Sequence, residues 1–239
     1  MLKKITLTTL TTIAAAALTA CGGGGGGSAT PTTPTAYPVQ QALQYAYSHG
    51  LQQTLGVTGT AVNGSTTYPV TGSLTFTLGT ATAYTFNGTP GYQVPATISG
   101  SVTLNGSTVP LNTTSTDYVN ASYQPIGNNS GGDYCVATTA FTPPATATVG
   151  MTGNLGVFTC YTNSTKTVVD TTDTESYVTT AGSNGNLNFQ IIETIRNSSN
   201  QVTGSGSTTY AITPAGIPSL VGLVATETTN GVTVNLNAQ

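Results

Sequence analysis

Apolar and hydroxyl-bearing residues alternate along much of the chain from residue 57 onward, and this period of two limits the fold more than any other feature. The alternation is clear at residues 73–78 (SLTFTL) and 101–104 (SVTL). Successive side chains of a β-strand point to opposite faces of the sheet, so each such segment has one apolar face and one hydroxyl-rich face. The chain is therefore predicted to be mainly β, with half-buried antiparallel strands.

Asn-Gly pairs lie between several of the alternating segments. This dipeptide is the strongest short-range signal for a β-hairpin, because both of its positions tolerate a positive φ. The pairs are found at residues 63–64, 105–106 and 230–231, and residues 87–88 are a further candidate. Strands that are joined by such turns follow one another in the sheet, so the pattern favours a meander.

The second half of the chain contains a longer predicted hairpin. Residues 187–196 and 201–213 flank a short polar segment, NSSN, that is typical of a turn. Residues 217–224 are more apolar, and periodicity alone leaves two options for them, a buried strand or a short helical turn.

One helix is predicted near the start of the domain. Pro38 is in a favourable first-turn position, and apolar residues recur at helical spacing from Val39 to Leu55. Gly56 is expected to end this helix. The predicted fold class is mainly β: an antiparallel meander or sandwich, with a half-barrel as the alternative, and one short N-terminal helix.

The chain carries very little charge. Charged residues make up 5% of it, against about a quarter of a typical globular protein. Beyond the first 20 residues the only basic side chains are Lys166 and Arg196. Nucleic-acid binding by phosphate neutralisation needs a basic patch, which two separate cations cannot form. The composition therefore excludes nucleic acid as a partner, and it excludes a polybasic membrane-binding surface for the same reason.

The start of the chain has the layout of a secretory signal. Lys3 and Lys4 give it a basic beginning, residues 13–18 are apolar, and small residues precede Cys21. The sequence Leu18-Thr19-Ala20-Cys21 closely resembles the lipobox of bacterial lipoproteins. That resemblance implies cleavage before Cys21, a diacylglycerol on its thiol and a fatty acid such as palmitate on the new amino group. More than one acyl chain gives stable membrane attachment without any protein contact to lipid.

A tether follows the cysteine. Six glycines form a flexible stretch directly after it, and the prolines up to Pro38 stiffen the next part toward extended conformations. The predicted organisation is a signal peptide at residues 1–20, the lipidated cysteine and tether at residues 21–38, and a single β-rich exported domain at residues 39–239.

Gly22 bears on the location of the protein. In the lipoprotein family, an Asp directly after the lipidated cysteine usually marks retention in the inner membrane, and this chain has Gly there. The resemblance therefore implies a protein of the cell envelope that is anchored to the outer membrane or the cell surface, with the leaflet left open.

The other cysteines are an even pair in a compartment that is expected to be oxidising. Cys135 and Cys160 both lie in apolar, strand-like segments. A disulfide that closes a loop of this length stabilises a fold by about 3.5 kcal/mol in the chain-entropy model. We predict this disulfide. Two buried free thiols are the alternative, and a metal site is less favoured because there is no CxxC motif and only one His.

No catalytic motif is found. No Ser lies in a nucleophile elbow, no Ser precedes a Lys of the exported domain by three residues, and a single His makes HExxH impossible. His49 lies on the predicted helix and is best interpreted as a solvated or locally hydrogen-bonded side chain. We therefore predict a protein that is not an enzyme and that needs no cofactor.

The acidic segment at residues 170–175 (DTTDTE) is the nearest approach to a metal site. On a strand, Asp173 and Glu175 share one face while Asp170 lies on the other. A hard cation such as Ca²⁺ is conceivable there, but the segment lacks the glycine and the regular spacing of an EF-hand loop. We interpret it as an exposed edge or turn that keeps the sheet soluble, with no metal.

Three classes of function are consistent with these features. The first is a non-enzymatic envelope lipoprotein with a structural or binding role, whose ligand is a protein or a glycan. The abundance of Tyr keeps a ligand groove lined by aromatic rings among the options. The second is a carrier of an apolar ligand, which needs a sizeable dry cavity. The third is a hydrolase of glycan or peptide, which needs two carboxylates from distant segments, for example Asp117 or Asp133 with Glu193.

Overall fold

Residues 35–229 and 231–239 fold into one antiparallel β-barrel with a single α-helix. The computed structural model of the chain describes residues 35–229 and 231–239. The elements are α1 (Val39–His49), β1 (Leu51–Asn63), β2 (Thr66–Leu78), β3 (Thr82–Phe86), β4 (Thr89–Leu104), β5 (Ser107–Asn120), β6 (Pro125–Ser130), β7 (Asp133–Thr139), β8 (Thr152–Tyr161), β9 (Val169–Ala181), β10 (Leu187–Asn197), β11 (Val202–Ile212), β12 (Pro218–Thr229) and β13 (Val232–Ala238).

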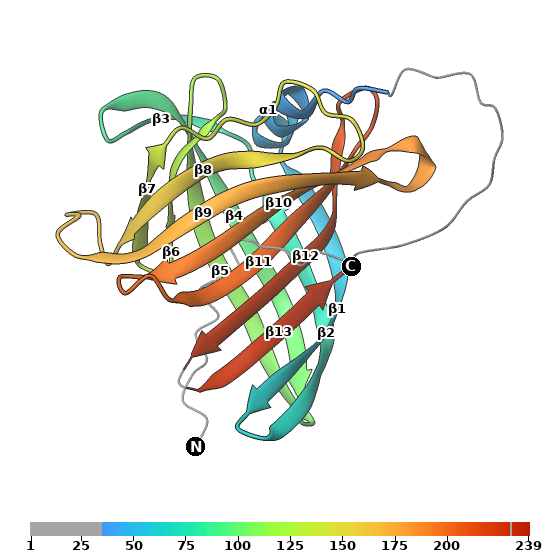
Figure 1. Ribbon diagram of the computed structural model, residues 1–239, viewed down its shortest axis with the longest axis vertical. Coiled ribbons are helices and arrows are strands. Elements are labelled where there is room, and N and C mark those ends of the chain that lie inside the picture. Colours follow the sequence, from blue (N-terminus) through green and yellow to red (C-terminus); the bar gives the residue numbers. More distant parts are fainter. Residues whose placement is uncertain (1–34, 230) are drawn as a thin grey trace.

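The sheet closes on itself (Figure 1). From β4 to β13 each strand pairs with its neighbour in the chain, β13 pairs with β1, and β2 pairs with both β1 and β4. These pairings form a closed ring of 12 strands, and β3 is an additional strand on the free part of β4. The prediction of a mainly β antiparallel meander with one N-terminal helix is confirmed, and the meander is a complete barrel.

Two glycines allow the close approach of β2 and β4, the pairing that closes the ring. Gly72 of β2 lies opposite Val102, and Gly100 of β4 lies opposite Leu74. A Cβ atom on either glycine would collide with the carbonyl oxygen of the facing strand. Glycine within a strand commonly marks such a close backbone approach or a bend at a barrel corner.

The helix is shorter than predicted. It ends at His49, and Gly50 adopts a φ of 76°, a left-handed conformation that glycine adopts without steric penalty. Residues from Leu51 to Leu55, which were expected to continue the helix, instead begin β1 and pair with β2. The prediction was wrong here because Leu51 and Leu55 fit a helical spacing of four and a strand spacing of two equally well.

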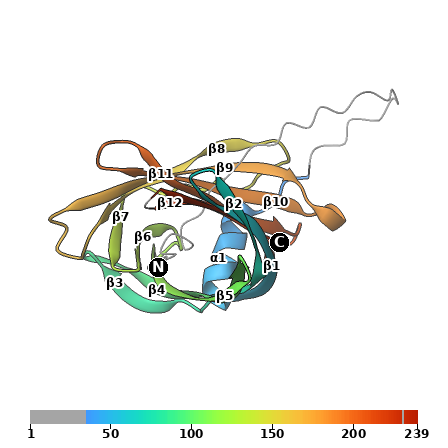
Figure 2. The same ribbon diagram turned by 90° about the horizontal axis from the view of Figure 1, so that it is seen from below.

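The helix lies inside one end of the barrel. The view along the barrel in Figure 2 places α1 within the ring of strands. Val39 and Leu43 of α1 belong to one buried apolar cluster together with Phe158 and Phe189 of the barrel wall. A second cluster is formed mainly by β1, β2 and β4 and includes Leu74. The apolar faces of the alternating strands therefore point inward, and their hydroxyl-rich faces point outward.

Most of the predicted turns are present. Asn87-Gly88 and Asn105-Gly106 each have positive φ at both residues and join β3 to β4 and β4 to β5. The pair at residues 63–64 also lies at a hairpin, between β1 and β2, and the NSSN segment joins β10 to β11. Residues 218–224 belong to a strand, β12, so this segment is a strand and not a helical turn.

Some predictions concern residues 1–34, which lie outside the described part of the chain. They are the signal peptide, the lipobox with Cys21 and most of the tether. Within residues 35–229 and 231–239, no helix is both long enough and apolar enough to cross a membrane.

Candidate functional site

A small cavity lies in the interior of the barrel, below α1. Its wall is built from α1 and from eight strands, β2, β4, β5, β6, β8, β9, β10 and β11, so it is in the centre of the ring. Its volume is about 90 Å³. A water molecule needs roughly 10 to 15 Å³ measured in this way, so the cavity has room for several waters or for a small ligand group.

Two carboxyl groups line this cavity. Asp117 projects from β5 and Glu175 projects from β9. Burial raises the pKa of Asp117 from 3.8 to about 7. Burial, together with the negative charges of Asp117 and Asp173, raises the pKa of Glu175 from 4.5 to about 8. The two groups are therefore close enough to interact, and both hold their protons more tightly than a carboxyl group in water.

Two tyrosines face the same cavity. Tyr47 comes from α1 and Tyr210 from β11. Burial raises the pKa of each phenol, and the negative charges of Asp117 and Glu175 raise it further. The interior of the barrel thus contains a group of four oxygen-bearing side chains, Asp117, Glu175, Tyr47 and Tyr210, which we call the lumen cluster.

A larger pocket lies outside the lumen, against β6 and β7. Its volume is about 320 Å³, at the lower end of the range for sites that bind small molecules. Asn87, Asn120 and Gln124 contribute amide groups to its wall, and exposed Ala140 is part of its lining. The Asn120 amide donates a hydrogen bond of 3.0 Å to Oε1 of Gln124. We call this the outer pocket.

The outer pocket and the lumen cavity have a common wall. Pro125 and Phe141 line both of them. Phe141 is only 3% exposed, and it belongs to the connection between β7 and β8. The neighbouring strand β6 has six residues and is shorter than the other strands of the closed ring. Phe141 and Pro125 are therefore the residues that lie between the outer pocket and the cavity of the lumen cluster.

An aromatic stack borders the outer pocket on the surface of the barrel. The ring of Phe86 lies 4.1 Å from that of Tyr118 and 5.2 Å from that of Tyr134. Tyr84 is 44% exposed and stacks on Tyr118 at 5.3 Å. The hydroxyl group of Tyr134 donates a hydrogen bond of 3.2 Å to Oδ1 of Asn87. Tyrosines thus contribute to an aromatic surface beside the outer pocket, whereas others, such as Tyr177, lie in the core.

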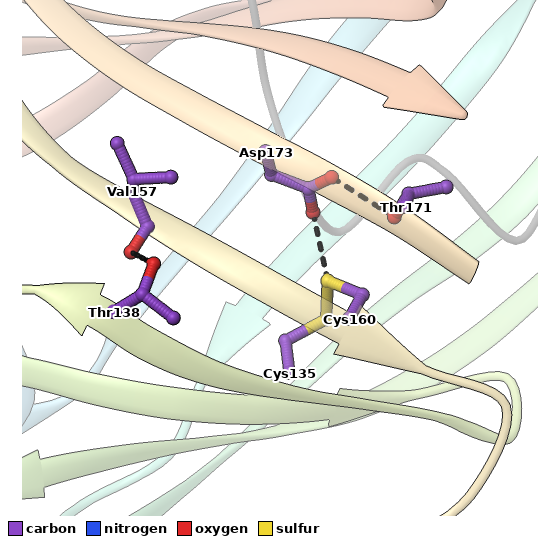
Figure 3. Close-up of a disulfide and its surroundings, with 6 residues drawn as sticks. All are labelled: Cys135, Thr138, Val157, Cys160, Thr171 and Asp173. Atoms are coloured by element: carbon purple, nitrogen blue, oxygen red, sulfur yellow. Dashed lines mark hydrogen bonds between the residues drawn. A yellow bond between two sulfur atoms is a disulfide. The ribbon is translucent and has the colours of Figure 1, made fainter. Parts of the chain in front are cut away.

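The predicted disulfide is present between β7 and β8 (Figure 3). Cys135 and Cys160 face each other in the register of these strands. Sγ of Cys160 lies 3.0 Å from Oδ2 of Asp173, and the Thr171 hydroxyl donates a hydrogen bond of 3.0 Å to Oδ1 of the same carboxyl group. A disulfide sulfur carries no hydrogen, so a hydrogen bond between Asp173 and Cys160 requires the protonated carboxyl group as the donor.

The surroundings of the Asp173 carboxyl group favour its protonated form more than water does. Asp173 is only 4% exposed. Burial raises its pKa from 3.8 to about 6; the Thr171 hydrogen bond lowers it, and the charges of Asp133 and Asp170 add to the rise.

The segment at residues 170–175 does not form one site. Asp170 and Asp173 line a pocket of about 190 Å³ together with Asp133 and Glu227, whereas Glu175 lines the lumen cavity. The interpretation of this segment as an exposed edge was wrong, because β9 is an internal strand of the ring and directs Asp173 and Glu175 inward. Of the three acidic residues in the segment, only Asp170 is exposed.

The remaining candidates are placed as follows. His49 stacks on Tyr45 at 4.1 Å and contacts the Ser48 hydroxyl at 2.9 Å, which confirms a local role at the end of the helix. Glu193 is 1% exposed and lines none of these three pockets. The pairs of carboxylates considered for a hydrolase, Asp117 or Asp133 with Glu193, are thus not brought together in any of these pockets.

Sequence reasoning missed the lumen cluster. Asp117 is isolated in a Thr-rich segment, and nothing local to Tyr47 or Tyr210 distinguishes them from the other tyrosines. The signal that could have identified Asp117 is its register: it follows Leu111, Thr113 and Ser115 at intervals of two, on the face that β5 directs inward.

Comparison of the chain with models of protein families, with curated proteins and with solved structures finds no match.

Proposed function

We propose that the protein is a lipid-anchored, non-enzymatic binding protein of the cell envelope, which takes up a small polar ligand through the outer pocket and holds it at the lumen cluster. The observation that carries this proposal is the common wall of the two spaces. Pro125 and Phe141 separate an accessible, amide-lined pocket from an interior cavity with two carboxyl groups and two phenols. A site with a few converging polar groups in a largely apolar wall is the usual form of a small-molecule site.

The two alternative functions have less support. An apolar carrier needs a large dry cavity, and the lumen cavity of about 90 Å³ is small and has carboxyl groups in its wall. A glycan hydrolase needs a cleft that admits a sugar between two carboxyl groups, and the carboxyl pair of the lumen, Asp117 and Glu175, lies behind Phe141. A binding role fits both the size and the position of the cavity.

The anchor supports a role at a membrane surface. The lipobox at Cys21 and the Gly- and Pro-rich tether imply attachment through lipid at some distance from the folded domain. A barrel that is held by a flexible tether remains free to exchange a ligand with its surroundings, and no contact between the barrel and the bilayer is needed.

Thermal melting of the purified protein tests the binding role. A ligand that binds only the native state raises the melting temperature by mass action. The probes are a panel of small polar solutes: amines, amino acids, polyols and monosaccharides. We expect at least one class to raise the melting temperature of the wild type, and the absence of any such effect would refute the proposal.

Two tryptophan variants locate the effect. Ala140→Trp places a large ring in the outer pocket and is expected to abolish the rise, because Ala140 is exposed and lines that pocket. Val149→Trp is the matched control, since Val149 is 54% exposed and is not part of either lining. A rise that survives in Ala140→Trp would show that the ligand enters elsewhere.

A further inference from the structure

The carboxyl groups of the lumen cluster accept no hydrogen bond from the residues that the structure describes, although the Ser115 hydroxyl and the Asn128 amide also line the cavity. Within the described part of the chain, neither Asp117 nor Glu175 takes part in a hydrogen bond or an ion pair, and the groups that act on them are other acids and phenols. Both side chains are half-buried and line the cavity. Polar groups withdrawn from bulk water usually have a partner, so a water molecule, an ion or a ligand in the cavity would supply it.

No basic side chain of the described residues reaches the cluster. Nζ of Lys166 donates a hydrogen bond of 3.2 Å to Oδ1 of Asn87, at the outer pocket. The Arg196 guanidinium donates one of 3.2 Å to the Asn200 carbonyl, at the turn between β10 and β11. A positive charge at the cluster would therefore have to come from a bound molecule.

Aromatic rings form much of the remaining wall. Phe76, Phe141 and Phe158 line the cavity together with the two phenol rings of the cluster, Tyr47 and Tyr210. The faces of aromatic rings attract cations, and cages of such rings recognise alkylated ammonium groups. Carboxyl groups among aromatic rings suit an organic cation in particular, because the carboxylates balance its charge while the rings contact its apolar carbon atoms.

An inorganic cation fits the cavity less well. Calcium takes six to eight oxygen ligands, about 2.4 Å away. The lumen cluster offers two carboxyl groups and two phenol oxygens, and the rest of the lining is mostly apolar. Most of the coordination shell would have to be water in a cavity of about 90 Å³.

We propose that the lumen cluster is a binding site for a small organic ammonium group, which Asp117 and Glu175 neutralise and the surrounding aromatic rings enclose. This inference rests on the proposed function and specifies the chemical class of its ligand. The ammonium group occupies the cavity, and the rest of the molecule extends past Phe141 toward the amide groups of the outer pocket. A ligand with a cationic head and a polar hydroxyl-bearing tail matches both spaces.

Choline and its neutral isostere dimethylbutanol test the proposal, since the two differ by the replacement of nitrogen with carbon. Binding of each to the purified full-length protein is measured by calorimetry at about pH 8, where a pKa of about 7 leaves Asp117 largely ionised and a pKa of about 8 leaves Glu175 partly ionised. We expect choline to bind at least about tenfold more tightly than the isostere. Methylammonium, which lacks the tail, should bind more weakly than choline and still better than the isostere.

Variants of the cluster provide the second arm. The double change Asp117→Asn with Glu175→Gln keeps the shape of both side chains and removes their charge. It should abolish the preference for choline over dimethylbutanol, while Asp170→Asn, which removes an exposed carboxylate, should leave the preference intact. Melting curves of each variant show that the fold is retained, and neutral amides at these buried positions are not expected to disrupt it.

The outcomes separate this inference from the proposed function. Equal binding of choline and its isostere would overturn the ammonium inference and leave a small-ligand site in place. Binding of calcium chloride in place of the ammonium compounds would overturn it in favour of a metal site. Failure of both ammonium compounds, with a positive result for another solute class in the melting panel, would also overturn it, whereas a wholly negative panel would refute the proposed function itself.

Discussion

Replacement of Glu175 by Gln should make the protein markedly more stable at alkaline pH. The carboxyl group has a pKa of about 8 in the folded protein and 4.5 in the unfolded chain. Each pKa unit corresponds to about 1.4 kcal/mol, so complete ionisation of Glu175 in the fold lowers the free energy of unfolding by about 4 to 5 kcal/mol. That is a large part of the 5 to 15 kcal/mol typical of a domain.

The sign of the effect follows from the raised pKa. Below about pH 4.5 the carboxyl group is neutral in both the folded and the unfolded state, so it does not change the free energy of unfolding. Between about pH 4.5 and pH 8 the unfolded chain releases a proton that the folded protein retains, so the free energy of unfolding falls with rising pH; above about pH 8 this contribution is constant. Gln is neutral throughout and of almost the same shape, so Glu175→Gln removes this dependence.

Urea denaturation at a series of pH values measures the difference. We expect the wild type and Glu175→Gln to differ by less than about 1 kcal/mol near pH 5 and by about 4 kcal/mol near pH 9. Asp170→Asn is the control, because it removes an exposed carboxylate from the same strand, and its curve should follow that of the wild type. Parallel curves for wild type and Glu175→Gln over this range would refute the assignment of Glu175 to the buried lumen cluster.

Three further results are expected. Cys21→Ser should abolish acylation and move the protein out of the membrane fraction; fatty-acid labelling that persists in the variant, or is absent from the wild type, would contradict the lipoprotein hypothesis. Joint replacement of Cys135 and Cys160 by Ser should lower the free energy of unfolding by about 3.5 kcal/mol, the chain-entropy value for a loop of this length, and a urea melt of unchanged midpoint would argue against it. Choline affinity should rise with pH as Asp117, with a pKa of about 7, and Glu175, with one of about 8, lose their protons. The other titratable groups near them are Tyr47 from α1, Tyr210 from β11 and Asp173 on β9, whose pKa values are raised as well, and Glu193 of β10, which lies opposite Glu175 in the sheet. An affinity independent of pH would exclude a charge-based site.

Much of the fold could be predicted because its determinants are local. The alternation of apolar and hydroxyl residues defines the inner and outer faces of the strands, and positive φ at Asn105 and Gly106 defines a hairpin. Closure of the ring could not be predicted in this way. Closure depends on the direct pairing of β2 with β4, although β3 lies between them in the sequence. It also depends on Gly72 and Gly100, whose lack of a side chain matters only when the two strands meet.

The candidate site depends on contacts that are distant in the sequence. The disulfide was predictable, since exclusion of Cys21 leaves Cys135 and Cys160 as the one pair. The lumen cluster was not, because α1, β5, β9 and β11 meet there only once the barrel is closed. Glu175 shows the difference: its face on the strand was predicted correctly, but the sequence does not say that this face points into a barrel rather than into water.

Nuclear magnetic resonance of the protein with carbon-13 in its tyrosine rings would test the central claim most directly, since it locates a ligand inside the barrel. Tyr47→Phe and Tyr210→Phe assign the two lumen signals, and choline is then added to the wild type. The account predicts that the signals of Tyr47 and Tyr210 shift on titration, whereas that of Tyr68, which lines neither the lumen cavity nor the outer pocket, stays in place. Shifts confined to tyrosines outside the lumen, or no shift at Tyr47 and Tyr210 under conditions where choline is bound, would contradict it.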